Sequence, residues 1–309
     1  MMGADVVGRH SVSPVWPVVA GILMAISLLI DRSLTLLLLV WFSAWALNVW
    51  VANNARGSAV YIAVPVFFGV TILILWEMAV WLFDVSPVIL PPPSAIATRF
   101  ATSTDVLWQD LVQTIFKGAL SGYAIGCIAA IGTALAIDRS SFLQRGLLPV
   151  GNFVAALPIV GTAPIFVMWY GFGWQSKAAV VVVMVFFPML VNTVQGLKAS
   201  ETMQRDLMRT YAAGYWQTLL KLRLPAALPF IFNGLKISTT LALIGAIVAE
   251  FFGSPTVGMG FRIKIEVGRL AMDMVWSEIT VAALAGSAFY GAVTYLERRT
   301  TFWHPSQRN

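Results

Sequence analysis

The chain has 309 residues, of which 59% are apolar and only 11% are charged. An average soluble domain carries about 25% charged residues, and a mean hydropathy of +0.81 leaves too little polar side chain to cover a water-facing surface. A soluble fold is therefore excluded, and most of the chain has to lie in lipid. In a chain that lies in lipid, the formal net charge of +6 raises the question on which side of the bilayer the basic residues lie. We expect no nucleic-acid partner.

Apolar runs of the length needed to cross a bilayer, about 20 residues, predict an all-α chain with eight spans. In chain order they are Trp16–Ile30, Leu34–Val51, Tyr61–Phe83, Leu111–Ile137, Leu147–Tyr170, Ala178–Val194, Ile231–Phe252 and Ile279–Leu296. The first two are separated only by Asp31-Arg32-Ser33, which fits a tight hairpin, a partly interfacial element or, for the first run, an uncleaved signal. Residues 1–60 are thus predicted to form an N-terminal extension with one or two transmembrane helices.

Charge predicts the orientation of these spans. Threading eight spans with the N-terminus inside leaves seven basic residues outside: Arg32, Arg99, Lys117, Lys177, Arg262, Lys264 and Arg269. The other 13 of the 20 basic residues are then cytoplasmic, as the positive-inside rule requires. Both termini and the segment 198–229 are therefore predicted to be cytoplasmic.

Small residues and prolines indicate how the spans meet. Gly118, Gly122, Gly126 and Ala130 recur every four residues, which predicts the close approach of another helix along one face. Pro158 and Pro164 interrupt the span Leu147–Tyr170, so this span is predicted to be kinked or locally unwound. Broken helices in membranes are tolerated where protein or a water-lined cavity satisfies the freed backbone groups, which makes this span a candidate pathway wall.

Two acidic residues, Glu77 and Glu250, lie inside predicted spans near their outer ends. An ionisable group at membrane depth is costly and is a functional candidate by default. The alternative is that both snorkel to the interface or pair with Lys177 or Arg262. A secondary carrier would be expected to place more carboxylates, and deeper ones, in its spans.

The chain lacks patterns for catalysis or for metal binding. Cys127 is the only cysteine, and His10 and His304 lie near opposite ends, so no metal or hydrolytic site is expected. No Gly-Lys dipeptide occurs, so the chain has no phosphate-binding loop of the Gly-x4-Gly-Lys-Ser/Thr type. We expect no cofactor on this chain, and an ATP-driven step would need ATP on a partner subunit.

The segment 198–229 combines apolar and charged residues at helical spacing. The apolar ones are Leu207, Met208, Tyr211, Ala212, Tyr215, Trp216 and Leu219. They predict a short amphipathic helix bounded by Pro225. Such a helix binds either anionic lipid or a groove on a partner protein. Asp206 and the aromatic cluster favour the protein groove.

Asp206-Leu-Met-Arg-Thr-Tyr-Ala212, followed by Trp216 and Leu222-Arg-Leu224-Pro225, resembles the coupling-loop signature of ABC importer permeases, E-A-A-x3-G-x9-I-x-L-P. The spacing and Leu224-Pro225 agree with it. Asp206 replaces Glu, Leu207-Met208 replace the alanines, Ala212 replaces Gly and Leu222 replaces Ile. Glycine adopts backbone torsions that are unfavourable for alanine. The resemblance implies contact with an ATPase through Asp206, Arg209, Ala212, Trp216, Leu224 and Pro225.

Other stretches resemble the nitrate, sulfonate and taurine type of these permeases. They are Leu90-Pro-Pro-Pro-Ser94, Leu157-Pro158, Ala163-Pro164, Trp169-Tyr-Gly171-Phe-Gly173, Phe186-Phe-Pro188, Asn192-Thr193, Gly196, Leu235-Lys236, Ala249-Glu250 and Phe302-Trp303-His304-Pro305. The resemblance covers roughly residues 61–309. It implies a polytopic helical bundle with a type I ABC importer permease-like core of six helices, to which residues 1–60 add about two helices.

The function implied by this resemblance is that of the permease subunit of a binding-protein-dependent ABC importer in a bacterial inner membrane. Its partners would be an ATP-binding subunit, a periplasmic binding protein, a second permease copy and membrane lipid. Its solute would be a sulfonate, nitrate, taurine, a pyrimidine precursor or a riboflavin-like molecule. The candidate pathway residues are Glu77, Thr162, Asn192 and Glu250. The alternatives are an ATP-independent carrier or channel, and a membrane scaffold that does not transport.

Overall fold

The computed structural model describes residues 32–54, 60–140, 158–253 and 256–303, with isolated residues between 19 and 27 and between 142 and 151. Every regular element in these ranges is a helix. The chain forms two compact units, Met1–Arg99 and Phe100–Asn309. The division after residue 60 stays a prediction from the sequence.

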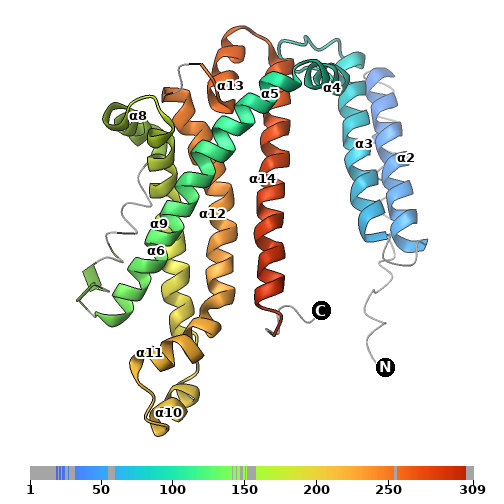
Figure 1. Cartoon of the computed structure of the whole chain (residues 1–309). Coiled ribbons are helices and arrows are strands. Elements are labelled where there is room, and N and C mark those ends of the chain that lie inside the picture. The colour runs from blue at the N-terminus through green and yellow to red at the C-terminus, as the bar shows by residue number, and fades with distance from the viewer. Residues whose placement is uncertain are drawn as a thin grey trace. The chain divides into compact units, whose positions relative to one another are not determined.

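The first unit contains two helices of membrane-spanning length, α2 (Arg32–Asn54) and α3 (Val60–Leu82), which pack against each other (Figure 1). They confirm the spans predicted at Leu34–Val51 and Tyr61–Phe83. Most of their large apolar side chains are exposed, as expected of helices that lipid surrounds. The short helix α4 (Pro93–Thr102) begins in this unit. The predicted span Trp16–Ile30 falls largely outside the described residues.

The second unit contains the remaining helices. The first membrane span of this unit is continuous through α5 (Thr104–Leu111), the π-helix η1 (Val112–Ala119) and α6 (Leu120–Arg139). The following elements are α8 (Ile159–Tyr170), α9 (Trp174–Lys198), α12 (Leu224–Gly253), α13 (Met259–Gly268) and α14 (Met272–Thr300). Between α9 and α12 lie two short helices and a second π-helix, described below.

The described part of the chain contains six helices that are long and apolar enough to cross a membrane, which confirms a multi-pass helical protein. Within the predicted span Leu147–Tyr170, the continuously described part is residues 158–170, in which Pro158 is outside any helix and Ile159–Tyr170 form the helix α8. Pro158 precedes the first turn of α8 and Pro164 lies inside it, so an interrupted span is confirmed at Pro158. A proline disfavours a helical conformation in the residue before it and is tolerated at a helix start because the first N–H groups of a helix have no partner there, which is why α8 begins directly after Pro158.

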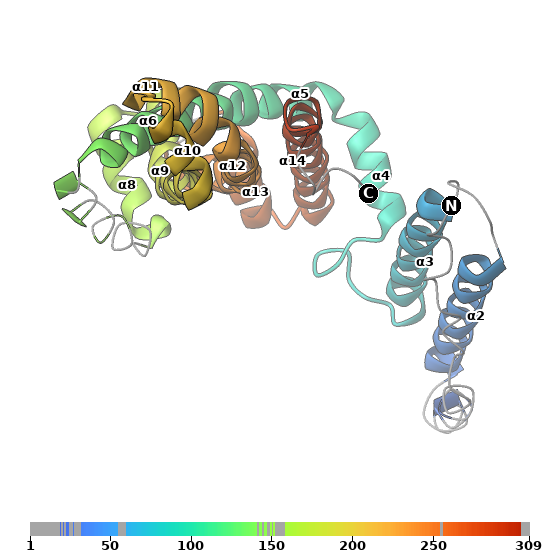
Figure 2. The same ribbon diagram turned by 90° about the horizontal axis from the view of Figure 1, so that it is seen from below.

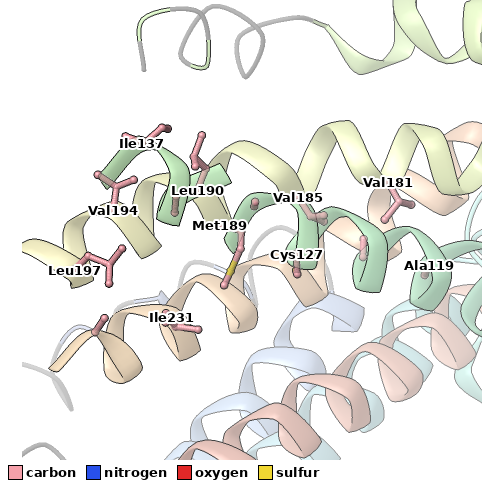
Figure 3. Packing of buried hydrophobic residues seen from close by; sticks show 14 of the residues in the cluster. Ala119, Cys127, Ile137, Val181, Val185, Met189, Leu190, Val194, Leu197 and Ile231 are labelled. Carbon is pink, nitrogen blue, oxygen red and sulfur yellow. The ribbon is translucent and has the colours of Figure 1, made fainter. Parts of the chain in front are cut away.

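The core of the second unit forms where α9 packs against α6 and α12. Its buried residues include Cys127 of α6, Val185 and Met189 of α9, and Ile231 of α12 (Figure 3). The small residues of α6 allow this packing, because a Cβ atom added at Gly122 would lie 2.5 Å from Val181 Cβ and 2.7 Å from the Ala178 carbonyl oxygen. The predicted close approach along the glycine stripe is therefore confirmed, and the partner helix is α9.

The two ends of the second unit differ in structure. The short helices between α9 and α12 cluster at one end, near the C-terminal end of α6, and α13 lies at the opposite end (Figure 1). Viewed along the bundle, the short helices lie across the ends of α6, α9 and α12 (Figure 2). This arrangement leaves a compact polar cap on one end of an apolar bundle.

Candidate functional site

The polar cap is formed by residues 199–223, which we call the coupling segment. It consists of α10 (Thr202–Thr210), α11 (Tyr215–Thr218) and the π-helix η2 (Leu219–Arg223). The prediction of a single amphipathic helix bounded by Pro225 is therefore wrong. Pro225 instead lies inside the continuous helical stretch Tyr215–Gly253, directly after the π-helix η2, where a proline removes one helical hydrogen bond.

A turn at Ala212 separates α10 from α11. The Ala212 N–H donates to the Arg209 carbonyl at 2.8 Å and the Ala213 N–H to the Met208 carbonyl at 2.9 Å, which is the hydrogen-bond pattern of a Schellman motif. This motif requires a left-handed residue after the helix, usually glycine. Ala212 fills the position with φ +52°. The alanine that replaces the family's glycine thus adopts the left-handed conformation that favours glycine.

Helix α10 presents an apolar stripe to its surroundings. Met203, Leu207 and Tyr211 follow at intervals of four residues, which places them on one face, and their exposed fractions are 80%, 56% and 77%. None of the residues of α10 is buried. Asp206 and Arg209 form an ion pair of 3.3 Å in which both side chains are largely exposed, so the pair adds little stability. An exposed stripe of this kind is suited to a groove on a partner.

Helix α11 and η2 are held on the bundle. Leu219 is buried in the core, and Tyr215 and Leu224 pack against it. Trp216 remains 58% exposed and lies beneath the Arg139 guanidinium, 5.8 Å from the ring centroid. Of the predicted coupling residues, Asp206, Arg209, Ala212 and Trp216 are exposed, whereas Leu224 and Pro225 are partly buried.

A charge cluster at the base of the coupling segment contains residues that the sequence did not single out. Arg223 donates two hydrogen bonds to the Asp138 carboxylate, from Nη1 to Oδ2 at 2.8 Å and from Nη2 to Oδ1 at 2.6 Å. The Tyr215 hydroxyl donates to Asp138 Oδ2 at 3.0 Å. Asp138 and Arg223 are 85 residues apart, so no local spacing could have revealed the pair. Met203 was missed as well, although its four-residue spacing to Leu207 was visible.

Two candidate pathway residues lie on different helices of the second unit. Thr162 of α8 donates its hydroxyl to the Ile159 carbonyl within the same helix at 3.2 Å. Asn192 of α9 accepts a hydrogen bond at 3.0 Å from Asn233 Nδ2 of α12, and the Asn233 side chain is exposed. A polar pair at membrane depth normally faces a bundle interior or a water-filled cavity, so Asn233 joins Asn192 as a candidate.

Glu77 lies in the first unit and caps the start of α4. Its Oε2 accepts the Ser94 N–H at 3.0 Å, and its Oε1 accepts the Ser94 hydroxyl at 2.7 Å and Trp81 Nε1 at 3.2 Å. A carboxylate at a helix N-terminus satisfies free N–H groups and interacts well with the helix dipole. These contacts give Glu77 a structural role at α4.

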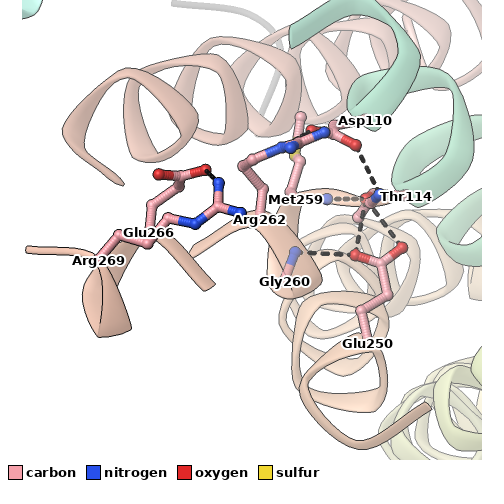
Figure 4. A network of polar contacts seen from close by, with 9 residues as sticks. Asp110, Thr114, Glu250, Met259, Gly260, Arg262, Glu266 and Arg269 are labelled. Carbon is pink, nitrogen blue, oxygen red and sulfur yellow. Dashed lines mark hydrogen bonds and ion pairs between the residues drawn. The ribbon is translucent and has the colours of Figure 1, made fainter. Parts of the chain in front are cut away.

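Glu250 lies at the end of the second unit opposite the coupling segment. Its side chain is buried and accepts hydrogen bonds from Thr114 Oγ1 at 2.9 Å and from the Gly260 N–H at 2.9 Å (Figure 4). Arg262 pairs instead with Asp110, at 2.8 Å. Glu250 therefore neither snorkels nor pairs with Arg262.

Together, Glu250, Thr114 and Asp110 hold the start of α13. The Met259 N–H donates to Thr114 Oγ1 at 2.9 Å, and the Gly258 N–H donates to Asp110 Oδ1 at 2.6 Å. Lys177, also fully buried, donates to the carbonyls of Phe172 and Gly253. These buried groups satisfy backbone atoms where α12 ends and α13 begins, as buried polar groups must.

A bundle of apolar helices of membrane-spanning length with an amphipathic segment exposed at one end defines the class of multi-pass helical membrane proteins. The comparison with known families makes this specific: residues 122–302 match the model of the binding-protein-dependent transport system inner membrane component. The chain belongs to this family, whose members are the permeases of ABC importers.

Individual relatives agree over most of the chain. The riboflavin transport system permease protein RibX of Chloroflexus aurantiacus is 31% identical over 237 residues, covering 76% of this chain and 88% of the relative. The formylaminopyrimidine transport permease protein ThiX of Halalkalibacterium halodurans is 28% identical over 243 residues, 79% of this chain and 96% of the relative. The taurine transport system permease protein TauC of Escherichia coli is 27% identical over 240 residues, 75% of this chain and 86% of the relative.

Proposed function

We propose that this chain is the permease subunit of an ATP-driven importer and that the coupling segment is the contact with its ATP-binding subunit. The observation that carries the proposal is the exposed stripe of Met203, Leu207 and Tyr211 on α10. An exposed apolar stripe on a short helix is suited to a hydrophobic groove. ATP is bound and hydrolysed by the partner, and this chain contributes no catalytic group.

The orientation follows from charge. The end of the second unit that carries the coupling segment also carries Arg139, Lys198, Lys221, Arg298 and Arg299. The positive-inside rule assigns such an end to the cytoplasm. The chain then lies in a bacterial inner membrane with both termini in the cytoplasm and with α13 on the periplasmic side, where a solute-binding protein delivers its cargo.

The mechanism is mechanical. Closure of two ATP-binding subunits on ATP displaces the helices docked in their grooves, and the bundle moves from an inward-facing to an outward-facing state. A second copy of the chain completes the translocation path between the two bundles. No covalent step occurs on this chain.

The solute is a small polar molecule. Relatives are named for the transport of riboflavin, formylaminopyrimidine and taurine, and these differ in charge and size. Sulfonates, nitrate, taurine, pyrimidine precursors and riboflavin-like compounds are the candidates. The amide pair Asn192 and Asn233 supplies uncharged hydrogen-bonding groups suited to lining their path.

The test is co-purification of the tagged chain from native membranes, followed by identification of bound proteins. We expect a P-loop ATPase, and we expect Arg209→Glu with Trp216→Ala to release it. The matched control is Arg269→Glu with Trp108→Ala, a pair that is similarly exposed but lies outside the coupling segment. Retention of the ATPase by the first variant, or its loss from both, would contradict the proposal.

Uptake by reconstituted vesicles distinguishes the solutes and the alternative classes. We expect uptake of one compound among taurine, an alkanesulfonate, nitrate, formylaminopyrimidine and riboflavin to require ATP and the co-purified subunit. Uptake driven by an ion gradient without ATP would identify a secondary carrier instead.

A further inference from the structure

The Arg223 guanidinium joins three elements of the second unit that are distant in sequence. Asp138 is the penultimate residue of α6, and Arg223 ends η2, directly before α12. The same guanidinium donates from Nε to the carbonyl of Leu197, the penultimate residue of α9, at 3.0 Å. One arginine side chain therefore binds the ends of α6 and α9 at the point where the coupling segment enters α12.

Arg223 offsets the unfavourable position of the Asp138 carboxylate at the end of α6. A carboxylate in the last turn of a helix faces the negative end of the helix dipole, which is unfavourable. The two-point hydrogen bond from a guanidinium is the strongest form of charge pairing in proteins. The side chains of Arg223 and Asp138 are only 15% and 10% exposed, so water compensates little when one partner is removed.

One further contact fastens the coupling segment to the end of α6, and another joins α9 to α12 nearby. The Arg139 guanidinium lies 5.2 Å from the ring centroid of Tyr215, within the range of a cation–π interaction. A Cβ atom added at Gly196 of α9 would lie 2.8 Å from Phe230 Cβ of α12, so these two helices are in close contact here. Helix α10, in contrast, has no buried residue. A displacement of α10 therefore reaches the bundle only through its two ends, directly into α9 across residues 199–201 and into α6 and α12 through α11 and η2.

We infer that Asp138 and Arg223 are positioning residues that transmit movement of the coupling segment to α6 and α9. This inference rests on the proposed function, because the movement originates in a bound ATP-binding subunit. The pair touches neither the docking stripe nor the solute path. Its role is to make α6 and α9 follow η2 as one body, so that docking and transmission depend on different residues.

The experiment measures hydrogen exchange of the purified complex of this chain with its co-purified ATP-binding subunit, without nucleotide and with Mg-ATP and vanadate. In the unsubstituted complex we expect nucleotide to change exchange in residues 199–215 and also in 130–139 and 189–198. In Asp138→Asn and in Arg223→Gln we expect the ATP-binding subunit to stay bound and the change to persist in 199–215. In the same variants we expect the nucleotide-dependent change in exchange to be lost in residues 130–139.

The matched control is Glu297→Gln, which breaks the Lys236–Glu297 pair between α12 and α14, of similar length (2.8 Å) and exposure (20% and 8%). This variant should retain the nucleotide-dependent changes in exchange in residues 130–139, 189–198 and 199–215. The exchanged pair Asp138→Arg with Arg223→Asp should restore the change in 130–139, because the charges again attract. It should not restore the change in 189–198, because the hydrogen bond to the Leu197 carbonyl is absent.

The inference would be overturned if nucleotide changed exchange in residues 130–139 of Asp138→Asn and Arg223→Gln as much as it does in the unsubstituted complex. Release of the ATP-binding subunit from these variants would also overturn it, because the pair would then shape the docking surface. If the unsubstituted chain binds no ATPase, the proposed function fails and the inference fails with it.

Discussion

Ala212 provides a sharp test of the coupling segment, because its conformation is unfavourable for its side chain. A left-handed backbone costs a non-glycine residue about 1–2 kcal/mol, and Ala212 has φ +52°. Glycine removes this cost but adds freedom to the unfolded chain, which offsets about 0.4–1 kcal/mol. The net expectation for Ala212→Gly is a stabilisation of the turn by about 0.5–1 kcal/mol.

Hydrogen exchange of the turn is the appropriate assay, since α10 has no buried residue and can open without global unfolding. The Ala213 N–H, bonded to the Met208 carbonyl, should exchange about two- to fivefold more slowly in Ala212→Gly, because 1.4 kcal/mol corresponds to a factor of about 10. The control is Ala213→Gly, at a neighbouring position without positive φ, measured at the Ala212 N–H, where exchange should be faster. Faster exchange in Ala212→Gly would refute this account of the turn.

Three further substitutions test the packing and the buried charges. Gly122→Ala should lower the stability of the detergent-purified protein by about 1–3 kcal/mol because α9 leaves no room for a Cβ atom, while Gly132→Ala, where no atom lies within 4 Å, should leave the melting temperature unchanged or higher. The fully buried Glu278 lies near the like-charged Asp110, so Glu278→Met should raise the melting temperature, in the range of about 1–4 kcal/mol seen when buried charged residues are replaced by apolar residues of similar volume. Thr114→Val removes the hydroxyl that donates to Glu250 and should destabilise the protein by about 1–3 kcal/mol. A lower melting temperature for Glu278→Met, or no change for Gly122→Ala or Thr114→Val, would contradict these assignments.

The membrane helices were predictable because a segment that crosses the hydrocarbon layer needs a long run of apolar residues. Helices α2, α3, α9 and α14 match predicted apolar runs, since only a helix satisfies its own backbone in hydrocarbon. The glycine stripe of α6 was also predictable, because in lipid close packing of helices selects small residues. These features depend on local spacing, which the sequence displays directly.

The structure of the coupling segment was predictable only in part. Its amphipathic pattern was visible, but the break between α10 and α11 was not, because the expected glycine of the turn is Ala212. The charge pair at its base depends on tertiary folding, which brings Asp138 of α6 to Arg223 of η2. For the same reason the sequence left open whether Glu250 reaches the interface or pairs with Lys177 or Arg262, whereas in the structure Arg262 pairs with Asp110.

The central claim is that α10 binds an ATP-binding subunit in the cytoplasm. Its most direct test is a photoreactive phenylalanine at the position of Leu207, 56% exposed, irradiated in intact native membranes. The expected product is a covalent adduct between this chain and a P-loop ATPase, which should be absent when the same group replaces Trp108 of α5. An adduct with lipid alone, or with a periplasmic protein, would contradict the claim.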